Sequence, residues 1–161
     1  MSKPLVGIIM GSKSDQDIMD EVAKTLEEFK IDYEMRIVSA HRTPDVMSDY
    51  AESAGERGLK VIIAGAGGSA HLPGMTASHT VLPVIAVPIK RNPNDHEALW
   101  SNIKMPPGVP LATLPENGAK NAALMAIEIL AINDEGLADK YKAYRQKIHN
   151  DVLADDRSLN N

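Results

Sequence analysis

The sequence contains no cysteine, and its aromatic residues are limited to one tryptophan, one phenylalanine and four tyrosines among 161 residues. The absence of cysteine excludes a disulfide framework, a thiolate nucleophile and a thiolate metal site. Positive charge is not in excess either, because the formal net charge is −5 at pH 7. This balance argues against binding to nucleic acid or to an anionic membrane. The length predicts a single domain over residues 1–161, large enough to bury a core of its own.

Charge is also missing from one long internal stretch, because residues 61–89 include no Asp, Glu, Lys or Arg. Such a length raises the question of a transmembrane helix. Seven glycines and prolines interrupt the stretch, however, so a continuous helix does not fit. Two buried strands separated by a glycine-rich loop and a short helix fit better. Since the first residues also lack the layout of a signal peptide, we expect a cytoplasmic protein that is not attached to a membrane.

Strand and helix patterns alternate along the chain. Short apolar runs predict strands at residues 5–10, 60–64, 84–87 and 111–114, and an apolar alternation predicts one at 33–38. Helical spacing of apolar residues predicts helices at about 18–29 and at 44–57, 75–79, 95–103 and 117–132. This order, with short connections, predicts a parallel sheet with helices on both faces. Folds of this kind bind ligands at the carboxyl ends of their strands.

The chain ends with two successive helical patterns, at residues 117–132 and from about 135 to 153. The second places apolar residues three or four positions apart on an otherwise charged helix: Leu137, Tyr141, Tyr144, Ile148 and Val152. Two helices in a row cannot continue a strand–helix alternation, so the last one leaves the sheet. It either folds back or reaches onto a neighbouring subunit. The polar tail at residues 155–161 is expected to fray.

The turn after the second strand reads Ser-Ala-His-Arg-Thr-Pro at residues 39–44. Imidazole can carry a proton at neutral pH, and the adjacent Arg42 is a permanent, planar anion binder. A lone histidine is more often a hydrogen-bonded structural residue, but His41 lies at the predicted binding edge, where His71 could approach it. The histidines show no metal-ligand spacing such as H-E-x-x-H, so no metal is expected. These residues favour acid–base catalysis by His41 on a phosphorylated small molecule.

Two glycine-bearing loops share that predicted edge. Residues 11–15 nearly match a P-loop, but Ser12 replaces the second glycine. The amides there still suit a monophosphate and Asp15 suits sugar hydroxyls, although Ser14 or Asp15 could equally be a simple helix cap. Residues 65–74 match the loose dinucleotide fingerprint G-x-G-x-x-[GA], but the acidic residue expected about 20 positions later is missing. A dinucleotide cofactor is therefore not expected.

Four ordered segments, at residues 11–15, 39–44, 64–75 and 104–110, resemble the class I N5-carboxyaminoimidazole ribonucleotide mutases of purine biosynthesis. These belong with the catalytic subunits of aminoimidazole ribonucleotide (AIR) carboxylase. The resemblance implies a flavodoxin-like three-layer α/β/α sandwich without metal or organic cofactor. It also implies a homo-octamer in which an arm at residues 134–161 packs on a neighbouring subunit. The implied reaction converts N5-carboxyaminoimidazole ribonucleotide into 4-carboxy-5-aminoimidazole ribonucleotide during IMP biosynthesis, by decarboxylation and recarboxylation.

The resemblance also implies individual roles. His41 is the catalytic proton shuttle and Asp15 binds the ribose hydroxyls. Arg42 and Ser12 bind the phosphate, and the glycine-rich loop closes a pocket that retains carbon dioxide. The expected substrate-binding residues are Gly11, Ser12, Ser14, Asp15, Ser39, Ala40, Arg42, Gly67, Gly68, Ser69, Ala70, His71 and Leu72.

Two departures from the mutase pattern stand out: the stretch at residues 91–100 differs from it, and Ser69 stands where alanine is common. The role of the 91–100 loop therefore stays open, a contact to an adjacent subunit's site being one alternative. A related class of lyases carboxylates AIR directly with carbon dioxide and typically has lysine after the histidine, so Arg42 favours the mutase. A third hypothesis is a non-enzymatic binding module of the same fold, which would have no need of His41.

Overall fold

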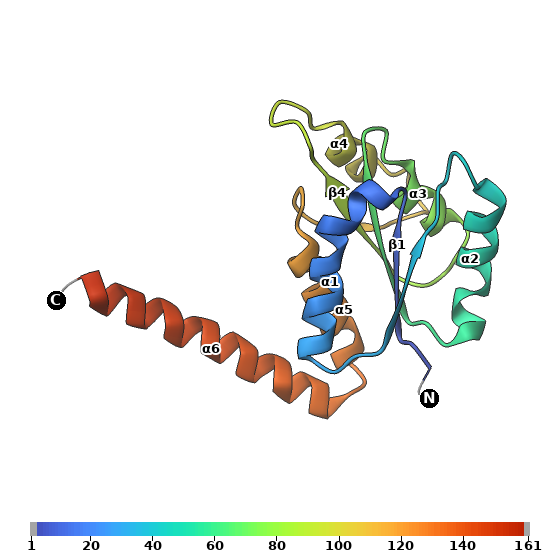
Figure 1. Ribbon diagram of the computed structural model, residues 1–161. Helices are drawn as coiled ribbons and strands as arrows, with labels where there is room; N and C mark the ends of the chain where they lie inside the picture. The colour runs from blue at the N-terminus through green and yellow to red at the C-terminus, as the bar shows by residue number, and fades with distance from the viewer. Residues whose placement is uncertain (1–2, 160–161) are drawn as a thin grey trace. The chain divides into compact units, whose positions relative to one another are not determined.

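The computed structural model describes residues 3–159, which divide into two compact units, one ending at Ala126 and one beginning at Ile127 (Figure 1). The first unit contains five strands: β1 (Val6–Met10), β2 (Tyr33–Ile37), β3 (Val61–Gly67), β4 (Val84–Ile89) and β5 (Ala112–Thr113). Its helices are a 3-10 turn, η1 (Lys13–Asp15), followed by α1 (Gln16–Glu28), α2 (Pro44–Arg57), α3 (His71–Ser78), α4 (Glu97–Ile103) and the first part of α5 (Ala119–Ala131). The second unit contains the rest of α5 and α6 (Glu135–Leu159).

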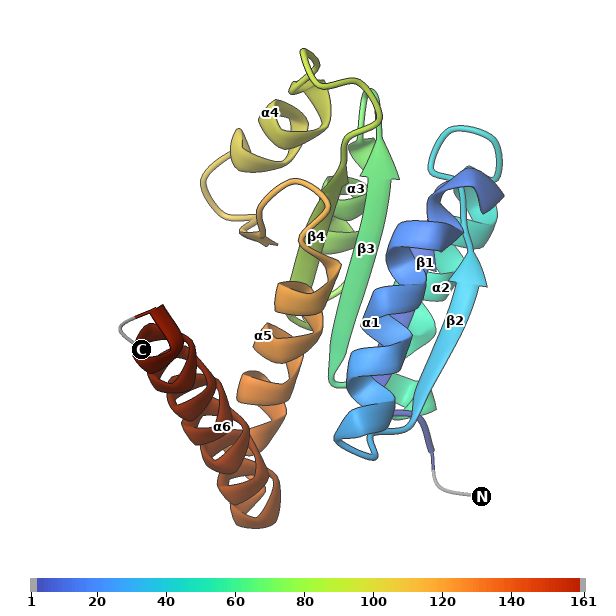
Figure 2. The ribbon, with the colours of Figure 1, turned by 60° about the vertical axis from the view of Figure 1, so that its left-hand side comes forward.

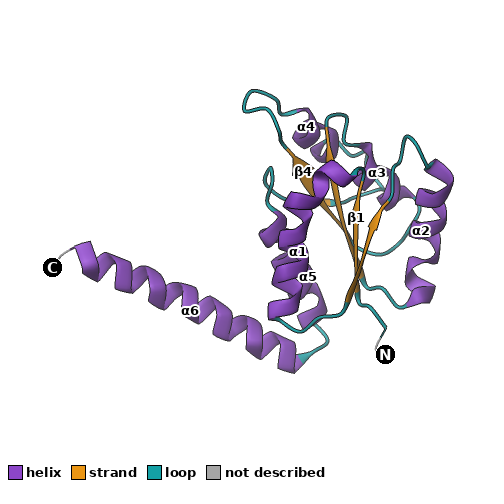
Figure 3. Cartoon of the chain, viewed as in Figure 1, coloured by secondary structure: helices purple, strands orange, loops and turns teal. Residues whose placement is uncertain are grey.

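The five strands form one parallel sheet in the order β2-β1-β3-β4-β5 (Figure 3). Helix α1 and the first part of α5 lie on one face, and α2, α3 and α4 lie on the other (Figure 2). The predicted parallel three-layer α/β/α fold is therefore confirmed. The chain moves outward from β1 to β2 and then returns to the other side of β1 to form β3. Parallel folds bind ligands at such a switch point, outside the carboxyl ends of the strands.

The centre of the sheet is buried on both faces. All residues of β1 and β4 are buried, and so are all residues of β3 except the last, Gly67. On one face, Met19, Val22 and Leu26 of α1 are each 0 % exposed, which completes the apolar face expected from their helical spacing. These strands match the predicted continuous apolar runs, which are typical of strands covered on both sides. The sheet is consequently a rigid base for the loops at its carboxyl edge.

Helix α3 begins four residues earlier than predicted, at His71 rather than at residue 75. The prediction treated Pro73 as part of a loop. In the structure Pro73 lies in the first turn of the helix, where a backbone N–H has no intrahelical partner and proline is tolerated. The correction matters for the site, because it places His71 on the first turn of a helix rather than in a flexible loop.

Helix α6, in the second unit, is a single helix of 25 residues. Its predicted apolar stripe is buried at Leu137, whereas Ile148 and Val152 are 42 % and 60 % exposed. The expectation of a frayed tail was wrong up to Leu159, because no glycine or proline after Gly136 ends the helix. The last two residues of that tail, 160–161, lie outside the described residues. Although α6 is long, no helix in the described part of the chain is apolar enough to cross a membrane.

Candidate active site

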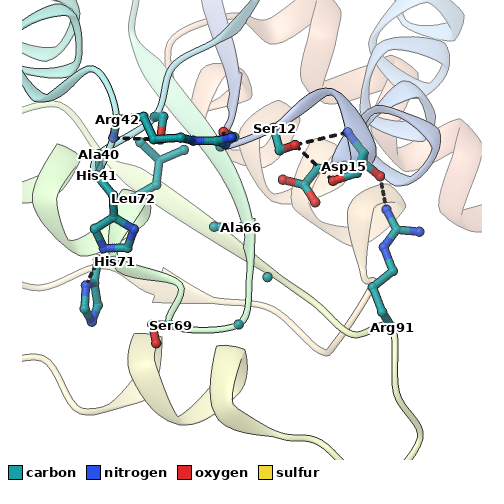
Figure 4. Close-up of a pocket in the computed structure, with 15 residues that line it drawn as sticks. Ser12, Asp15, Ala40, His41, Arg42, Ala66, Ser69, His71, Leu72 and Arg91 are labelled. Carbon is teal, nitrogen blue, oxygen red and sulfur yellow. Dashed lines mark hydrogen bonds between the residues drawn. The ribbon is translucent and has the colours of Figure 1, made fainter.

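A cavity of about 640 Å³ opens at the edge where β1, β2 and β3 end (Figure 4). The predicted site residues that line it are Gly11, Ser12, Ser14, Asp15, Ser39, Ala40, His41, Arg42, Gly67, Gly68, Ser69, His71 and Leu72. Ala70 is the one predicted residue outside this lining. It is buried and immediately precedes α3. The structure thus brings three separate segments of the chain to one cavity, although their binding of a substrate stays a prediction.

The turn between β2 and α2 is closed by bonds between Ser39 and Thr43. The Thr43 backbone N–H donates to the Ser39 carbonyl at 3.0 Å, and the Thr43 hydroxyl donates to the same carbonyl at 3.1 Å. The Ser39 N–H donates back to the Thr43 hydroxyl at 3.1 Å. Pro44, the first residue of α2, has a backbone already suited to a helix start. These bonds hold the backbone on both sides of His41 and Arg42, which are exposed at the tip of the turn.

Arg42 joins this turn to the loop after β1. Its Nη2 donates to the Gly11 carbonyl at 2.7 Å, and its Nε donates to the Ser39 hydroxyl at 3.3 Å. Within the described residues its Nη1 has no such protein partner, so that nitrogen can donate to a ligand. The backbone N–H of Arg42 also donates to the Ser39 hydroxyl, at 3.2 Å. The guanidinium is therefore held in place with its Nη1 left for an anion.

His41 and His71 are in contact across the cavity wall. The His41 Nε2 and the His71 Nδ1 lie 2.8 Å apart, and the two rings meet edge to face with their centroids 4.9 Å apart (Figure 4). Such a bond requires a hydrogen on one of the facing nitrogens and a lone pair on the other. Full protonation of both rings would break it. The pair can therefore hold one mobile proton at a defined place in the cavity.

The loop after β1 places Ser12 and Asp15 on the other side of the cavity. The Ser12 hydroxyl accepts bonds from the Ser14 backbone N–H at 3.3 Å and from the Ser14 hydroxyl at 3.0 Å. This leaves its own hydrogen to donate to a ligand. Asp15 is only 7 % exposed, and burial raises the pKa of its carboxyl above the usual 3.8 while Arg91 opposes that rise. Ser12 is thus suited to an anion and Asp15 to hydroxyl groups.

The glycine-rich segment approaches the cavity with its backbone. A Cβ on Gly67 would lie 3.2 Å from the Ile89 carbonyl oxygen of the neighbouring strand, so a side chain would crowd that backbone. Gly68 has a φ of +58°, a conformation that glycine adopts without strain. Local geometry therefore favours glycine at both positions, and the absence of side chains lets the backbone line the pocket. Among residues 3–159 there is no group of three or more His, Asp or Glu side chains able to hold a metal ion.

Sequence reasoning missed two residues of the cavity, Ala66 and Arg91. Ala66 is next to the predicted glycine-rich loop, and β3 extends through it. Arg91 follows β4, which ends at the same edge of the sheet as β1 and β3. The rule that parallel sheets bind ligands at the carboxyl ends of their strands already pointed to this loop.

The fold and the cavity define a class of protein: a doubly wound α/β protein with a cavity at the switch point of its sheet, lined by an arginine and a histidine pair. Comparison with known families gives the particular member. Residues 5–151 match the family model described as AIR carboxylase, and the chain belongs to this family.

Close relatives are named N5-carboxyaminoimidazole ribonucleotide mutase. The protein of Saccharolobus solfataricus is 57 % identical over 152 residues, which cover 94 % of this chain and 96 % of the relative. That of Bacillus subtilis is 53 % identical over 154 residues, covering 94 % and 95 % respectively. The crystal structure of Treponema denticola PurE superposes with a TM-score of 0.88 at 32 % identity, covering 97 % of this chain and 98 % of that chain. These matches support the flavodoxin-like fold.

Proposed function

We propose that this protein is an isomerase of purine biosynthesis that converts N5-carboxyaminoimidazole ribonucleotide into 4-carboxy-5-aminoimidazole ribonucleotide. The observation that carries the proposal is the His41–His71 contact of 2.8 Å in the cavity that Arg42 also lines. The cavity thus places a proton carrier beside an anion binder. A reaction that removes carbon dioxide from a nucleotide and adds it back requires both groups. Relatives with more than half of their residues identical carry the mutase name.

The reaction needs one proton to be given and one to be taken. His41, protonated, donates its proton to the exocyclic nitrogen as the bond from that nitrogen to the carboxylate breaks and carbon dioxide leaves. The ring carbon C4 then attacks the carbon dioxide and forms the new carbon–carbon bond. His41 next removes the hydrogen from C4, which restores the aromatic ring and returns His41 to its starting state. A single imidazole can serve as acid and then as base because it changes charge near neutral pH.

The rest of the nucleotide is bound by the walls of the cavity. The Arg42 Nη1 and the hydroxyls of Ser12 and Ser39 are the donors available for the phosphate. The Asp15 carboxylate accepts hydrogen bonds from the ribose hydroxyls. The backbone of Gly67 and Gly68 lies against the carboxyl group, and closing of the pocket over the bound nucleotide would limit the loss of the carbon dioxide intermediate to water.

A direct substrate assay tests this function. Purified protein is given either N5-carboxyaminoimidazole ribonucleotide alone or AIR with bicarbonate, and formation of 4-carboxy-5-aminoimidazole ribonucleotide is followed. We expect rapid turnover of the first substrate. Turnover only of the second would identify a direct carboxylase, and turnover of neither, with binding retained, would identify a binding module.

The proposal extends to a cytoplasmic homo-octamer in which residues 134–161 form an arm on a neighbouring subunit. Two features support an assembly. Large apolar side chains of the first unit are exposed, including Trp100 at 52 % and Val81. The stripe on α6 is also exposed toward its end, at Ile148 and Val152. Apolar surface that recurs along one face of a helix is typical of a helix that packs against another element.

Removing residues 134–161 should dissociate the oligomer, because it removes this stripe from every subunit. Light scattering measures the mass of the truncated protein, and we expect smaller species than for the full chain. Removing only residues 156–161 is the matched control, since it shortens α6 but keeps the stripe. This shorter truncation should leave the number of subunits in the oligomer unchanged. If the protein without residues 134–161 kept the full oligomeric mass, the arm would play no part in assembly.

A further inference from the structure

Arg91 connects the loop after β4 to the segment that carries Ser12 and Asp15. Its Nη1 donates to Oδ2 of Asp17 at 2.8 Å, and its Nη2 donates to Oδ1 of the same carboxylate at 2.7 Å. The Nη2 also donates to the carbonyl oxygen of Ser14. Figure 4 shows the guanidinium reaching this segment from the loop after β4. A two-point contact between guanidinium and carboxylate is the most directional ion pair that side chains form.

The segment that Arg91 contacts joins β1 to α1 through a short turn. It comprises η1, in which the Asp15 N–H donates to the Ser12 carbonyl at 3.1 Å, and the start of α1, which carries Asp17. Turns of this type have poorer hydrogen-bond geometry than an α-helix. Arg91 bonds the residue before Asp15 and, through Asp17, the second residue after it. It therefore holds the backbone on both sides of the carboxylate that lines the cavity.

The base of Arg91 is itself held firmly. The backbone N–H of the preceding Lys90 donates to the Asn117 side-chain oxygen at 2.8 Å, and the Asn117 amide donates to the Lys90 carbonyl at 3.0 Å. The Lys90 ammonium pairs with Glu116 at 3.1 Å. The loop thus connects the β5–α5 region to the cavity, and Arg91 starts from a defined position. An exposed ion pair without such support contributes little.

Arg91 also affects the charge of Asp15. Burial raises the pKa of the Asp15 carboxyl, and the Arg91 guanidinium is the strongest influence that lowers it, ahead of Arg42. The neighbouring Asp17 carboxylate acts in the opposite direction and raises that pKa. An ionised carboxylate accepts hydrogen bonds with both oxygens, whereas a protonated one becomes a donor as well. Arg91 consequently favours the form of Asp15 that accepts bonds from two hydroxyls.

We propose that Arg91 is a positioning residue of the substrate site, which acts through Asp17 and the Ser14 carbonyl to hold Asp15 for the ribose hydroxyls. This inference rests on the proposed function, because the ribose belongs to the proposed substrate. Three of the five guanidinium N–H groups are donated to Asp17 and Ser14, so most of the hydrogen bonding of Arg91 is directed at the turn that carries Asp15. The atypical 91–100 loop thereby acquires a role inside its own subunit.

The test compares Arg91→Gln with the wild-type protein in two ways. The first is KM and kcat for N5-carboxyaminoimidazole ribonucleotide, and the second is the Kd for ribose 5-phosphate, measured by calorimetry. We expect KM and Kd to rise about fivefold. This factor corresponds to the largest interaction energies found for ion pairs at exposed sites. The kcat should stay within about twofold, because Arg91 does not touch the reacting atoms.

The pH dependence separates positioning from a simple loss of structure. Without Arg91 the pKa of Asp15 moves further up. When the pH is lowered, binding of ribose 5-phosphate should therefore begin to weaken at a higher pH in Arg91→Gln than in the wild type. Asp17→Asn should also raise KM. It should, however, shift the loss of binding on acidification to a lower pH, because the charge that raises the Asp15 pKa is lost. Arg42 also faces Asp15, and His41 and His71 line the same cavity, so only differences between variants are interpreted.

Two further variants complete the design. Arg91→Lys keeps the charge but not the two-point contact. Its binding should therefore weaken at the same acidic pH as that of the wild type, while its KM should be higher than the wild-type value. Arg57→Gln is the matched control, because Arg57 pairs with Glu34 at 2.9 Å and does not line the cavity. It should lower the melting temperature and leave KM, Kd and the pH profile unchanged. The double variant of Arg91→Gln and Asp17→Asn should show a KM no higher than Arg91→Gln alone.

The outcomes are distinct. If Arg91→Gln behaves like Arg57→Gln, with a lower melting temperature but unchanged KM, Kd and pH profile, Arg91 has only a structural role and the inference is wrong. If the wild-type protein does not turn over the nucleotide, the proposed function fails, and the Kd for ribose 5-phosphate still tests Arg91. If the wild type does not bind ribose 5-phosphate at all, the ribose role of Asp15 and the inference fail together.

Discussion

His41→Asn should abolish turnover of N5-carboxyaminoimidazole ribonucleotide while the protein stays folded. Asparagine retains a side-chain donor that can face the His71 Nδ1, so the 2.8 Å contact of His41 has a substitute. It cannot, however, give and take a proton near neutral pH. General acid–base catalysis contributes roughly 10²- to 10⁴-fold to a rate, and His41 acts in both halves of the proposed reaction, so kcat should fall at least that far. Steady-state kinetics measures the loss, and circular dichroism measures the fold.

The matched control replaces a histidine elsewhere in the chain. His79 contacts the Ser48 hydroxyl at 3.1 Å and Glu52 at 3.0 Å, and it lines a different cavity. His79→Asn should therefore lower the melting temperature slightly and leave kcat unchanged. A His41→Asn protein that keeps wild-type kcat would remove His41 from the mechanism and favour a binding module. A protein that loses kcat together with its folded circular dichroism spectrum would call for His41→Gln, which must also be inactive when folded.

The fold could be predicted where local signals mark both ends of an element. Helix α2 begins at Pro44 and ends at Arg57, as predicted, because proline favours the first helical position and Gly58 adopts the left-handed conformation that ends a helix. The positions of β1, β3 and β4 along the chain could be predicted because their apolar runs are uninterrupted. The extension of β3 through Gly67 could not be predicted, because it depends on pairing with Ile89 of another strand. Glycine by itself indicated a loop.

The site shows the same division between local and long-range information. His41 and Arg42 are adjacent in the sequence and follow an apolar run, so their place at the sheet edge could be inferred. The contact between His41 and His71 was considered as an alternative, since both lie after predicted strands, but only the structure gives its distance. The bond from Arg91 to Asp17 joins residues 74 positions apart, and no local pattern connects them. Position in the sheet, rather than motif, was the signal that could have found Arg91.

Arg42→Ala should weaken substrate binding about tenfold and leave kcat nearly unchanged. Losing a hydrogen bond to a charged group costs about 1.5–3 kcal/mol, and the exposure of Arg42 places the expected loss near the lower value. The phosphate is distant from the reacting ring, so the contact is present equally in the ground state and in the transition state. Uniform binding of this kind changes KM without changing kcat. Kinetics with the nucleotide and calorimetry with ribose 5-phosphate measure the two quantities.

Arg42→Lys distinguishes the charge of Arg42 from its geometry. Arg42 donates to Gly11 and Ser39 at the same time, and a lysine ammonium cannot span both acceptors while it also faces the phosphate. The lysine variant should therefore bind ribose 5-phosphate more tightly than Arg42→Ala but less tightly than the wild type. Raising the salt concentration should reduce the difference between the lysine and alanine variants, because it screens an exposed charge. An Arg42→Ala protein with an unchanged Kd would refute the phosphate role, and Ser12 and Ser39 would then have to hold the anion without a cationic partner.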